Sequence, residues 1–173
     1  MNILRVMGCD NLQYGGTERY IVDFAKKCKE KGHKLVLSYN GPLASREFQN
    51  DLESHSAIIE PCQLRSKYSF KNLFRIRQLI YKHDIDIVHS YFQPGWRYAA
   101  IAGKLCGKYT VKTAGNTPLK GSVASGINIS LIHKIRFFFS FYIPCLFLDK
   151  LVCISESVKD DFLLFGISPI HNL

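Results

Sequence analysis

Residues 3–31 read ILRVMGCDNLQYGGTERYIVDFAKKCKEK. The apolar run at residues 3–7 has the length and composition of a short buried strand. A loop that contains Gly15 and Gly16 follows, and from residue 17 to residue 31 apolar side chains recur at helical spacing. The stretch therefore predicts a strand, a glycine-containing loop and an amphipathic helix, which is the opening unit of an α/β fold.

The same alternation of strand and helix patterns continues to the end of the chain. Further strands are expected at residues 34–39, 57–60, 85–90, 109–113 and 150–154. Further helices are expected at residues 46–54, 70–83, 96–106, 129–147 and 156–164. Strands that alternate with helices pair in parallel through helical crossovers. The sequence therefore predicts one α/β domain over residues 1–173, built on a Rossmann-like, doubly wound parallel sheet.

Composition is that of a globular protein, with 47% hydrophobic and 21% charged residues in 173. The six cysteines form no CxxC pair, and the first residues lack the basic and apolar regions of a signal peptide. We therefore expect reduced thiols and a cytoplasmic location.

Positive charge is concentrated in the middle of the chain. Residues 61–140 hold thirteen Lys and Arg against two Asp, a net charge of +11, whereas the remaining residues carry −2. Such a segment favours anionic partners: membrane lipid, phosphorylated substrates or nucleic acid. The alternative is a basic surface that only contacts solvent. No RNP-type or helix-turn-helix pattern accompanies the charge, so we expect no nucleic-acid partner.

Two basic segments are candidates for contact with an anionic membrane surface. One is the basic side of the expected helix at residues 70–83, and the other precedes an apolar run at residues 137–148. That run has 12 residues and is interrupted by Pro144, whereas a spanning helix needs about 20 residues, so we expect peripheral contact with the inner face of the membrane. The alternative is an ordinary core helix. The candidate contacts are Lys71, Arg75, Lys82, Lys134, Arg136 and Phe137.

The loop after the first strand is the expected ligand site, because open parallel sheets bind ligands at the carboxyl ends of their strands. Gly15 and Gly16 would let the backbone approach a ligand, and Thr17 is the expected N-cap of the helix. A helix N-terminus attracts phosphate through its N–H groups and partial positive charge. The alternative is a loop that needs glycine only for its turn.

Several common functions lack their sequence signatures. The first loop does not contain G-x-G-x-x-G, and the second strand ends in Ser38, Tyr39 and Asn40, with no acid to bind a ribose hydroxyl. The phosphate loop GxxxxGK[ST], the zinc pair HExxH and the nucleophile elbow GxSxG are also missing. The six histidines are scattered, so we expect no metal site.

The run Gly15-Gly16-Thr17-Glu18-Arg19, with its helix and the following GHKLV at residues 32–36, resembles the start of family 4 glycosyltransferases. Those read G-G-x-E-R, then an amphipathic helix, then G-H-x-V. Residues 41–43, 86–89 and 149–156 agree with the family in the same order. The last segment, DKLVCISE, is similar to the family's D-x-V-I-x-x-S-E.

This resemblance implies that the chain is the first half of a GT-B fold. Members transfer a sugar from a nucleotide sugar to an acceptor, usually with retention and without a metal ion. The first domain mainly holds the acceptor, and its glycine-rich loop faces the donor phosphates, whereas a C-terminal domain, absent here, binds the nucleotide sugar. The chain alone is then expected to be inactive, with no cofactor besides the donor and with a sugar or lipid-linked acceptor in polysaccharide or glycolipid synthesis.

The resemblance also suggests site residues, although it identifies no catalytic residue. Many relatives place a histidine after the fifth strand, within T-x-H-[GD], but residues 113–116 here read TAGN. The substrate- or phosphate-binding candidates are Gly15, Gly16, Thr17, Arg19, His89 and Asn116. For His89, a hydrogen-bonded core residue is the alternative. For the whole chain, the alternatives are a non-catalytic, membrane-associated partner of a separate transferase and, less favoured, a nucleic-acid-binding module.

Overall fold

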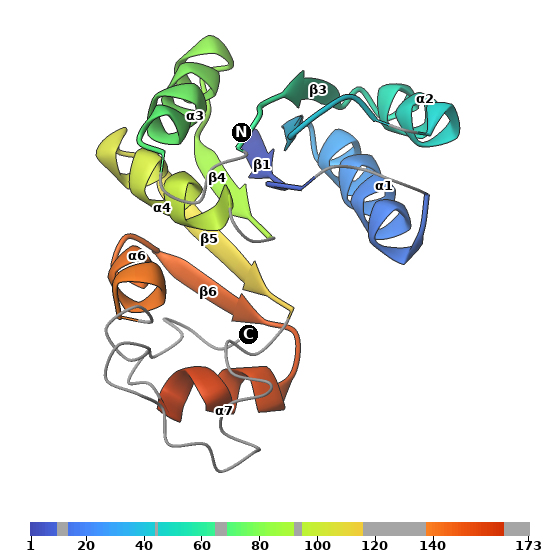
Figure 1. Cartoon of the computed structure of the whole chain (residues 1–173). Coiled ribbons are helices and arrows are strands. Elements are labelled where there is room, and N and C mark those ends of the chain that lie inside the picture. The colour runs from blue at the N-terminus through green and yellow to red at the C-terminus, as the bar shows by residue number, and fades with distance from the viewer. Residues whose placement is uncertain (10–13, 44, 65–68, 92–94, 116–137, 165–173) are drawn as a thin grey trace.

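The computed structural model describes residues 1–9, 14–43, 45–64, 69–91, 95–115 and 138–164 (Figure 1). Their six strands form one entirely parallel sheet in the order β3-β2-β1-β4-β5-β6. The strands are β1 (Asn2–Val6), β2 (Lys34–Tyr39), β3 (Ile58–Pro61), β4 (Ile87–Ser90), β5 (Tyr109–Ala114) and β6 (Lys150–Cys153). The order reverses between β1 and β4, which confirms the predicted doubly wound, Rossmann-like fold.

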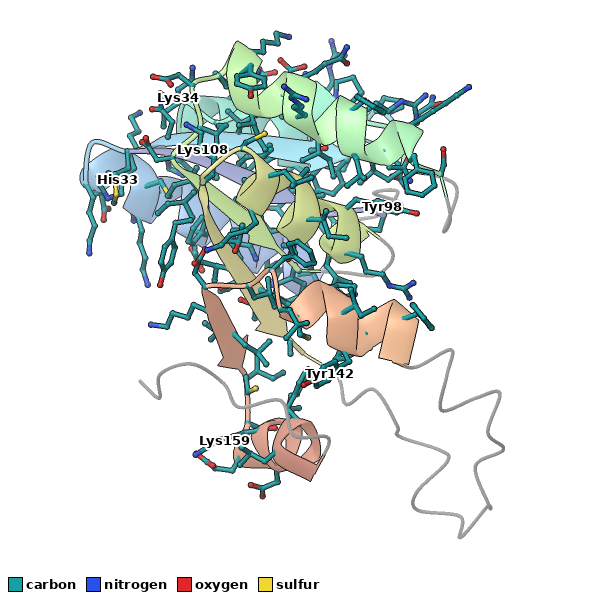
Figure 2. The ribbon with its side chains drawn as sticks, turned by 90° about the vertical axis from the view of Figure 1, so that its left-hand side faces the viewer. His33, Lys34, Tyr98, Lys108, Tyr142 and Lys159 are labelled. Carbon is teal, nitrogen blue, oxygen red and sulfur yellow. The ribbon has the colours of Figure 1, made fainter. Side chains whose placement is uncertain are left out.

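Helices cover both faces of this sheet. The α-helices are α1 (Gly16–Glu30), α2 (Arg46–Ser54), α3 (Lys71–Lys82), α4 (Gly95–Leu105), α6 (Ile143–Cys145) and α7 (Glu156–Leu164), and η1 (Phe138–Tyr142) is a π-helix. In Figure 1, α1 and α2 lie on one side of the strands, and α3, α4 and α6 lie on the other. Figure 2 shows Lys34, at the start of β2, and Lys159, on α7, at opposite ends of the molecule.

Each strand divides its side chains between two cores, because successive residues of a strand point to opposite faces. On one face, Ile3 and Leu37 pack with Ile21 of α1 and Phe48 of α2. On the other face, a second cluster joins the sheet to α3 and α4, with Leu4, Val36, Val88, Ile76 and Ala99 among its members. Burial on both faces explains why the strands read as continuous apolar runs.

Two glycines allow α4 to approach the sheet. A Cβ atom on Gly103 would lie 2.6 Å from Cγ2 of Thr110 in β5, closer than real Cβ contacts. A Cβ atom on Gly95 would lie 2.9 Å from the Cα atom of Gly8, two residues after the end of β1. Any side chain at either position would push α4 away from the centre of the sheet.

The far end of the sheet carries a third cluster around Trp96, which packs against Phe141 with ring centroids 5.1 Å apart. Phe141 belongs to η1, so the described part of the helix expected at residues 129–147 is a π-helix followed by the short α6. Residues 129–137 lie outside the described part of the chain. Ser155 caps α7, because its Oγ accepts the Val158 N–H at 3.3 Å.

The prediction that Thr17 caps the first helix is wrong. The helix already begins at Gly16, with Gly15 as its N-cap residue. Glu18 Oε2 accepts the Gly15 N–H at 3.0 Å, so the carboxylate of the third helical residue bonds back to the N–H of the N-cap residue.

Candidate functional site

The candidate site lies at the carboxyl ends of the strands, where β1 leads into α1 and the strand order reverses between β1 and β4. Gly16 is exposed, and a Cβ atom on it would meet no other atom within 4 Å. Arg19 is exposed one turn further along α1, and Thr17 is half-buried between them. These four predicted residues, Gly15 included, therefore lie together at the N-terminus of α1.

The N-terminus of α1 is not a bare anion site, because the Gly15 N–H is already bonded to the Glu18 carboxylate. That carboxylate also opposes the partial positive charge of the helix end. A phosphate at this position would compete with Glu18 for the Gly15 N–H.

His89 lies in β4 directly beside Arg5 of β1 and is buried. Its Nε2 is 2.9 Å from Oγ1 of Thr113 in β5, a hydrogen bond that joins the two strands. Burial, together with the positive charges of Arg5 and Lys112, lowers the pKa of His89 to about 3. The imidazole is therefore neutral near pH 7, and the geometry is that of a hydrogen-bonded core histidine. Asn116, the sixth predicted residue, lies outside the described residues.

The sequence interpretation missed Arg5, although a single arginine in the apolar run at residues 3–7 was a signal of it. Arg5 is 0% exposed, and within the described part of the chain none of its three side-chain nitrogens has a hydrogen-bond partner. Its guanidinium carbon lies 5.0 Å from the ring centroid of Tyr20, 4.9 Å from that of Phe24 and 5.3 Å from that of Tyr91. Burial lowers the pKa of Arg5, although an arginine remains charged in proteins.

Tyr91, the first residue after β4, also lies close to Gly115, where the family resemblance would place a histidine. A Cβ atom on Gly115 would lie 3.6 Å from the Tyr91 hydroxyl oxygen and 3.8 Å from Cδ1 of Ile154. The site edge of the sheet thus combines a phenol, a guanidinium and a neutral imidazole.

A second buried cation, Lys112, lies on the opposite face of the sheet. Its Nζ is 4.7 Å from the ring centroid of Trp96, and burial lowers its pKa to about 8. Among the described residues, no group of three or more His, Cys, Asp or Glu side chains could hold a metal ion.

Sequence comparison then identifies the fold family. Residues 14–172 match the sequence model of glycosyltransferase family 4. The chain belongs to glycosyltransferase family 4. No curated protein sequence matches it.

Solved structures place this family 4 chain in the N-terminal half of a GT-B fold. A glycosyltransferase from Rickettsia africae is 25% identical with a TM-score of 0.63, over 94% of this chain and 38% of that one. Anabaena HepE, solved with UDP, is 15% identical with a TM-score of 0.66, over 98% and 42%. A UDP-GlcNAc 2-epimerase from Methanocaldococcus jannaschii is 14% identical with a TM-score of 0.55, over 97% and 43%. The chain spans about two fifths of the length of these three proteins. The similarities to HepE and to the epimerase show the fold alone.

The family 4 domain carries three of its predicted basic residues on α3. Lys71, Arg75 and Lys82 are all exposed. Lys82 Nζ pairs with Glu60 Oε1 at 2.6 Å, and Arg75 donates to the backbone oxygen of Gln63. The other three candidate contacts, Lys134, Arg136 and Phe137, lie outside the described residues. No helix among the described residues is long and apolar enough to span a membrane.

The aromatic residues at α3 are exposed and do not pack on the sheet. Phe74 is 64% exposed and Tyr81 is 61% exposed, and Phe70, directly before α3, is 78% exposed. The buried positions of α3 are instead Asn72, Ile76, Leu79 and Ile80. An open groove of about 550 Å³ runs between α3 and α4, lined by Phe70, Leu73, Phe74, Arg77, Ala102, Leu105 and Cys106.

Proposed function

We propose that the chain is the acceptor-binding half of a glycosyltransferase that transfers a sugar from a nucleotide sugar held by a second domain. The observation that carries the proposal is the family 4 match over residues 14–172 of a chain that spans about two fifths of its GT-B neighbours. We include in the proposal retention at the anomeric carbon, independence of metal ions and a role in cell-surface polysaccharide or glycolipid synthesis.

The geometry of the site edge supports a binding role more than a catalytic one. His89, with its pKa lowered to about 3, is a poor general base at neutral pH, because effective acid–base catalysis needs a pKa near the working pH. The exposed start of α1 at Gly16 can approach the donor phosphates when the second domain closes over it. Donor binding and most stabilisation of the transition state would then come from that second domain.

A transfer assay tests this proposal directly. The purified chain should transfer no labelled sugar from UDP-glucose, UDP-GlcNAc or GDP-mannose to lipid or saccharide acceptors. A fusion with the nucleotide-sugar domain of a family 4 enzyme should gain transfer. Sugar transfer by the unfused chain would refute the proposal that a second domain must supply the donor site. A folded fusion that binds the donor but remains inactive on every acceptor would count against the transferase function.

We also propose that the acceptor half contacts an anionic membrane surface through α3, on the cytoplasmic side. The support is the joint exposure of Lys71, Arg75 and Lys82 with the aromatic rings of Phe74 and Tyr81. Basic side chains near an anionic bilayer contribute about 1 kcal/mol each, and exposed aromatic rings favour its interfacial region. A lipid-linked acceptor would be presented at such a surface.

A further inference from the structure

The strongest unexplained feature of the molecule is the buried positive charge of Arg5. In the part of the chain that the structure describes, no carboxylate pairs with its guanidinium. The Tyr20 hydroxyl lies near enough to interact with the charge but makes no hydrogen bond of normal geometry. An arginine this deeply buried is ordinarily paired with a carboxylate or bonded through its five N–H groups.

Three aromatic rings lie over this charge. The rings of Tyr20, Phe24 and Tyr91 lie 4.9–5.3 Å from the guanidinium carbon, within range of cation–π attraction. Cation–π contacts stabilise the charge but leave its N–H donors unused. Among the described residues, the donors of Arg5 therefore have no hydrogen-bond partner, as expected of a group that bonds a ligand.

The position of Arg5 in the fold connects it to the site edge. Arg5 is the second-last residue of β1 and pairs with His89, the second-last residue of β4, at the reversal of strand order. Ligands bind at this point of open α/β sheets. The neutral His89 beside it adds no competing charge.

Two tyrosines separate the guanidinium from solvent. Tyr20 of α1 is 47% exposed, and its ring centroid lies 6.3 Å from that of Tyr91. Because nearly half of Tyr20 already faces solvent, rotation of its side chain sacrifices little packing. Phe24 would still contact Arg5 from α1 after such a rotation.

We propose that Arg5 binds an anionic oxygen group of a substrate, a phosphate or a carboxylate, that enters between Tyr20 and Tyr91 at the carboxyl edge of the sheet. A guanidinium bonds such groups through two parallel N–H donors, and these charge-assisted bonds are stronger than contacts with a ring. The anion would replace the Tyr20 ring over the charge. Arg5 then acts as a binding residue of the acceptor half, and this role does not require that transfer be observed.

Nuclear magnetic resonance can test the contact in the intact chain. The side-chain Nε–H resonance of Arg5 would be followed in ¹⁵N-arginine-labelled protein during titration with inorganic pyrophosphate or with glucuronate. Pyrophosphate represents the diphosphate of a donor, and glucuronate represents an acidic acceptor sugar. We expect one of them to shift the Arg5 resonance in a saturable way, which also identifies the source of the anion. No saturable shift of that resonance with either probe would overturn the proposal.

Substitution provides the second measurement. Arg5→Met keeps the length of the side chain and should weaken binding of the active probe about tenfold or more, since a charge-assisted bond is lost. Arg46→Met, at the exposed start of α2, is the matched control and should leave binding unchanged. Equal losses in the two variants would show nonspecific attraction and overturn the proposal. If Arg5→Met does not fold, the titration of the wild-type Arg5 resonance still tests whether the anion binds at Arg5.

The outcome is separable from that of the proposed transferase function. Binding at Arg5 together with an inactive fusion protein would retain this inference and weaken the transferase proposal. An active fusion protein, in a case where neither probe shifts the Arg5 resonance, would retain the transferase proposal and overturn this inference.

Discussion

Replacement of Asp149 should destabilise the domain more than any comparable change on its surface. Asp149 immediately precedes β6, and its Oδ2 accepts the Thr110 N–H at 2.8 Å and the Thr110 hydroxyl at 2.9 Å. Its Oδ1 pairs with Nζ of Lys104 at the end of α4. One carboxylate thus joins β5, β6 and α4, which explains why an aspartate stands at this point of the chain.

The expected loss can be worked out from these contacts. In Asp149→Ala the N–H of Thr110, a residue that is 0% exposed, loses a charge-assisted hydrogen bond, which costs about 1.5–3 kcal/mol. The pair with the half-exposed Lys104 adds about 0.5 kcal/mol. The free energy of unfolding should therefore fall by about 2–3.5 kcal/mol, which lowers Tm by roughly 4–14 °C in a chain of this length.

The effect should also depend on pH. Burial acts to raise the pKa of Asp149, but the hydrogen bonds from Lys104 and Thr110 outweigh it and hold the pKa below the ordinary value of 3.8. A carboxyl with a lowered pKa contributes stability that is fully present above its unfolded pKa and is lost as pH falls through its folded pKa. The difference between wild type and Asp149→Ala should be constant near neutral pH and shrink below about pH 4.

Urea unfolding at pH 7 and at pH 3.5 measures both effects. Glu156→Ala is the control, because Glu156 also pairs with a lysine, Lys159 at 3.1 Å, but its side chain is 81% exposed. That change should alter the free energy of unfolding by less than about 0.5 kcal/mol. Equal urea midpoints for the two variants, or a loss in Asp149→Ala that does not shrink at low pH, would refute the reasoning.

Two further predictions concern packing and membrane contact. Gly103→Ala should lower the free energy of unfolding measured in urea by about 1–3 kcal/mol, because its Cβ would overlap the side chain of Thr110 in β5. Gly16→Ala is the control and should not destabilise the domain, because its Cβ would meet no other atom. Equal urea midpoints for the two variants would contradict this prediction. Changing Lys71, Arg75 and Lys82 together to Gln should reduce flotation with anionic vesicles, and wild-type flotation should fall as salt rises. Equal recovery with neutral vesicles, or an equal loss in the control triple, would mean that α3 only contacts solvent. The control changes three exposed lysines at the end of α1, of which the last is its C-cap residue: Lys26, Lys27 and Lys31.

Much of the fold could be predicted from sequence because helices and strands differ in the periodicity of their apolar residues, and turns that contain glycine mark where a helix or strand ends. The strand expected at residues 57–60 is found at Ile58–Pro61, and the helix expected at residues 46–54 is found with these bounds. The parallel order followed from the alternation itself, since a strand–helix–strand unit pairs its strands in parallel.

Contacts between distant segments could not be predicted in the same way. A helical wheel separates the sides of α3, but only the position of α4 decides that Ile76 is buried and Phe74 is exposed. The N-cap of α1 was misplaced by two residues, because the helix begins at Gly16 and the Glu18 carboxylate bonds back to the N–H of Gly15. The rings around Arg5 come from α1 and from the end of β4, so their meeting depends on the crossover that brings β4 beside β1.

The departure from the family motif after β5 acquires a physical explanation from the neighbouring strand. At residue 115, the position of the relatives' histidine, a Cβ atom would already contact the Tyr91 hydroxyl at 3.6 Å and Ile154 at 3.8 Å. Both are ordinary van der Waals distances, so a side chain at residue 115 would pack against Tyr91, which brings a hydroxyl group to this place. The ring of Tyr91 also lies over Arg5, with its centroid 5.3 Å from the guanidinium carbon. The residue at 115, the tyrosine at 91 and the arginine at 5 are therefore connected through Tyr91, and a change at residue 115 would act on the cover of the buried charge.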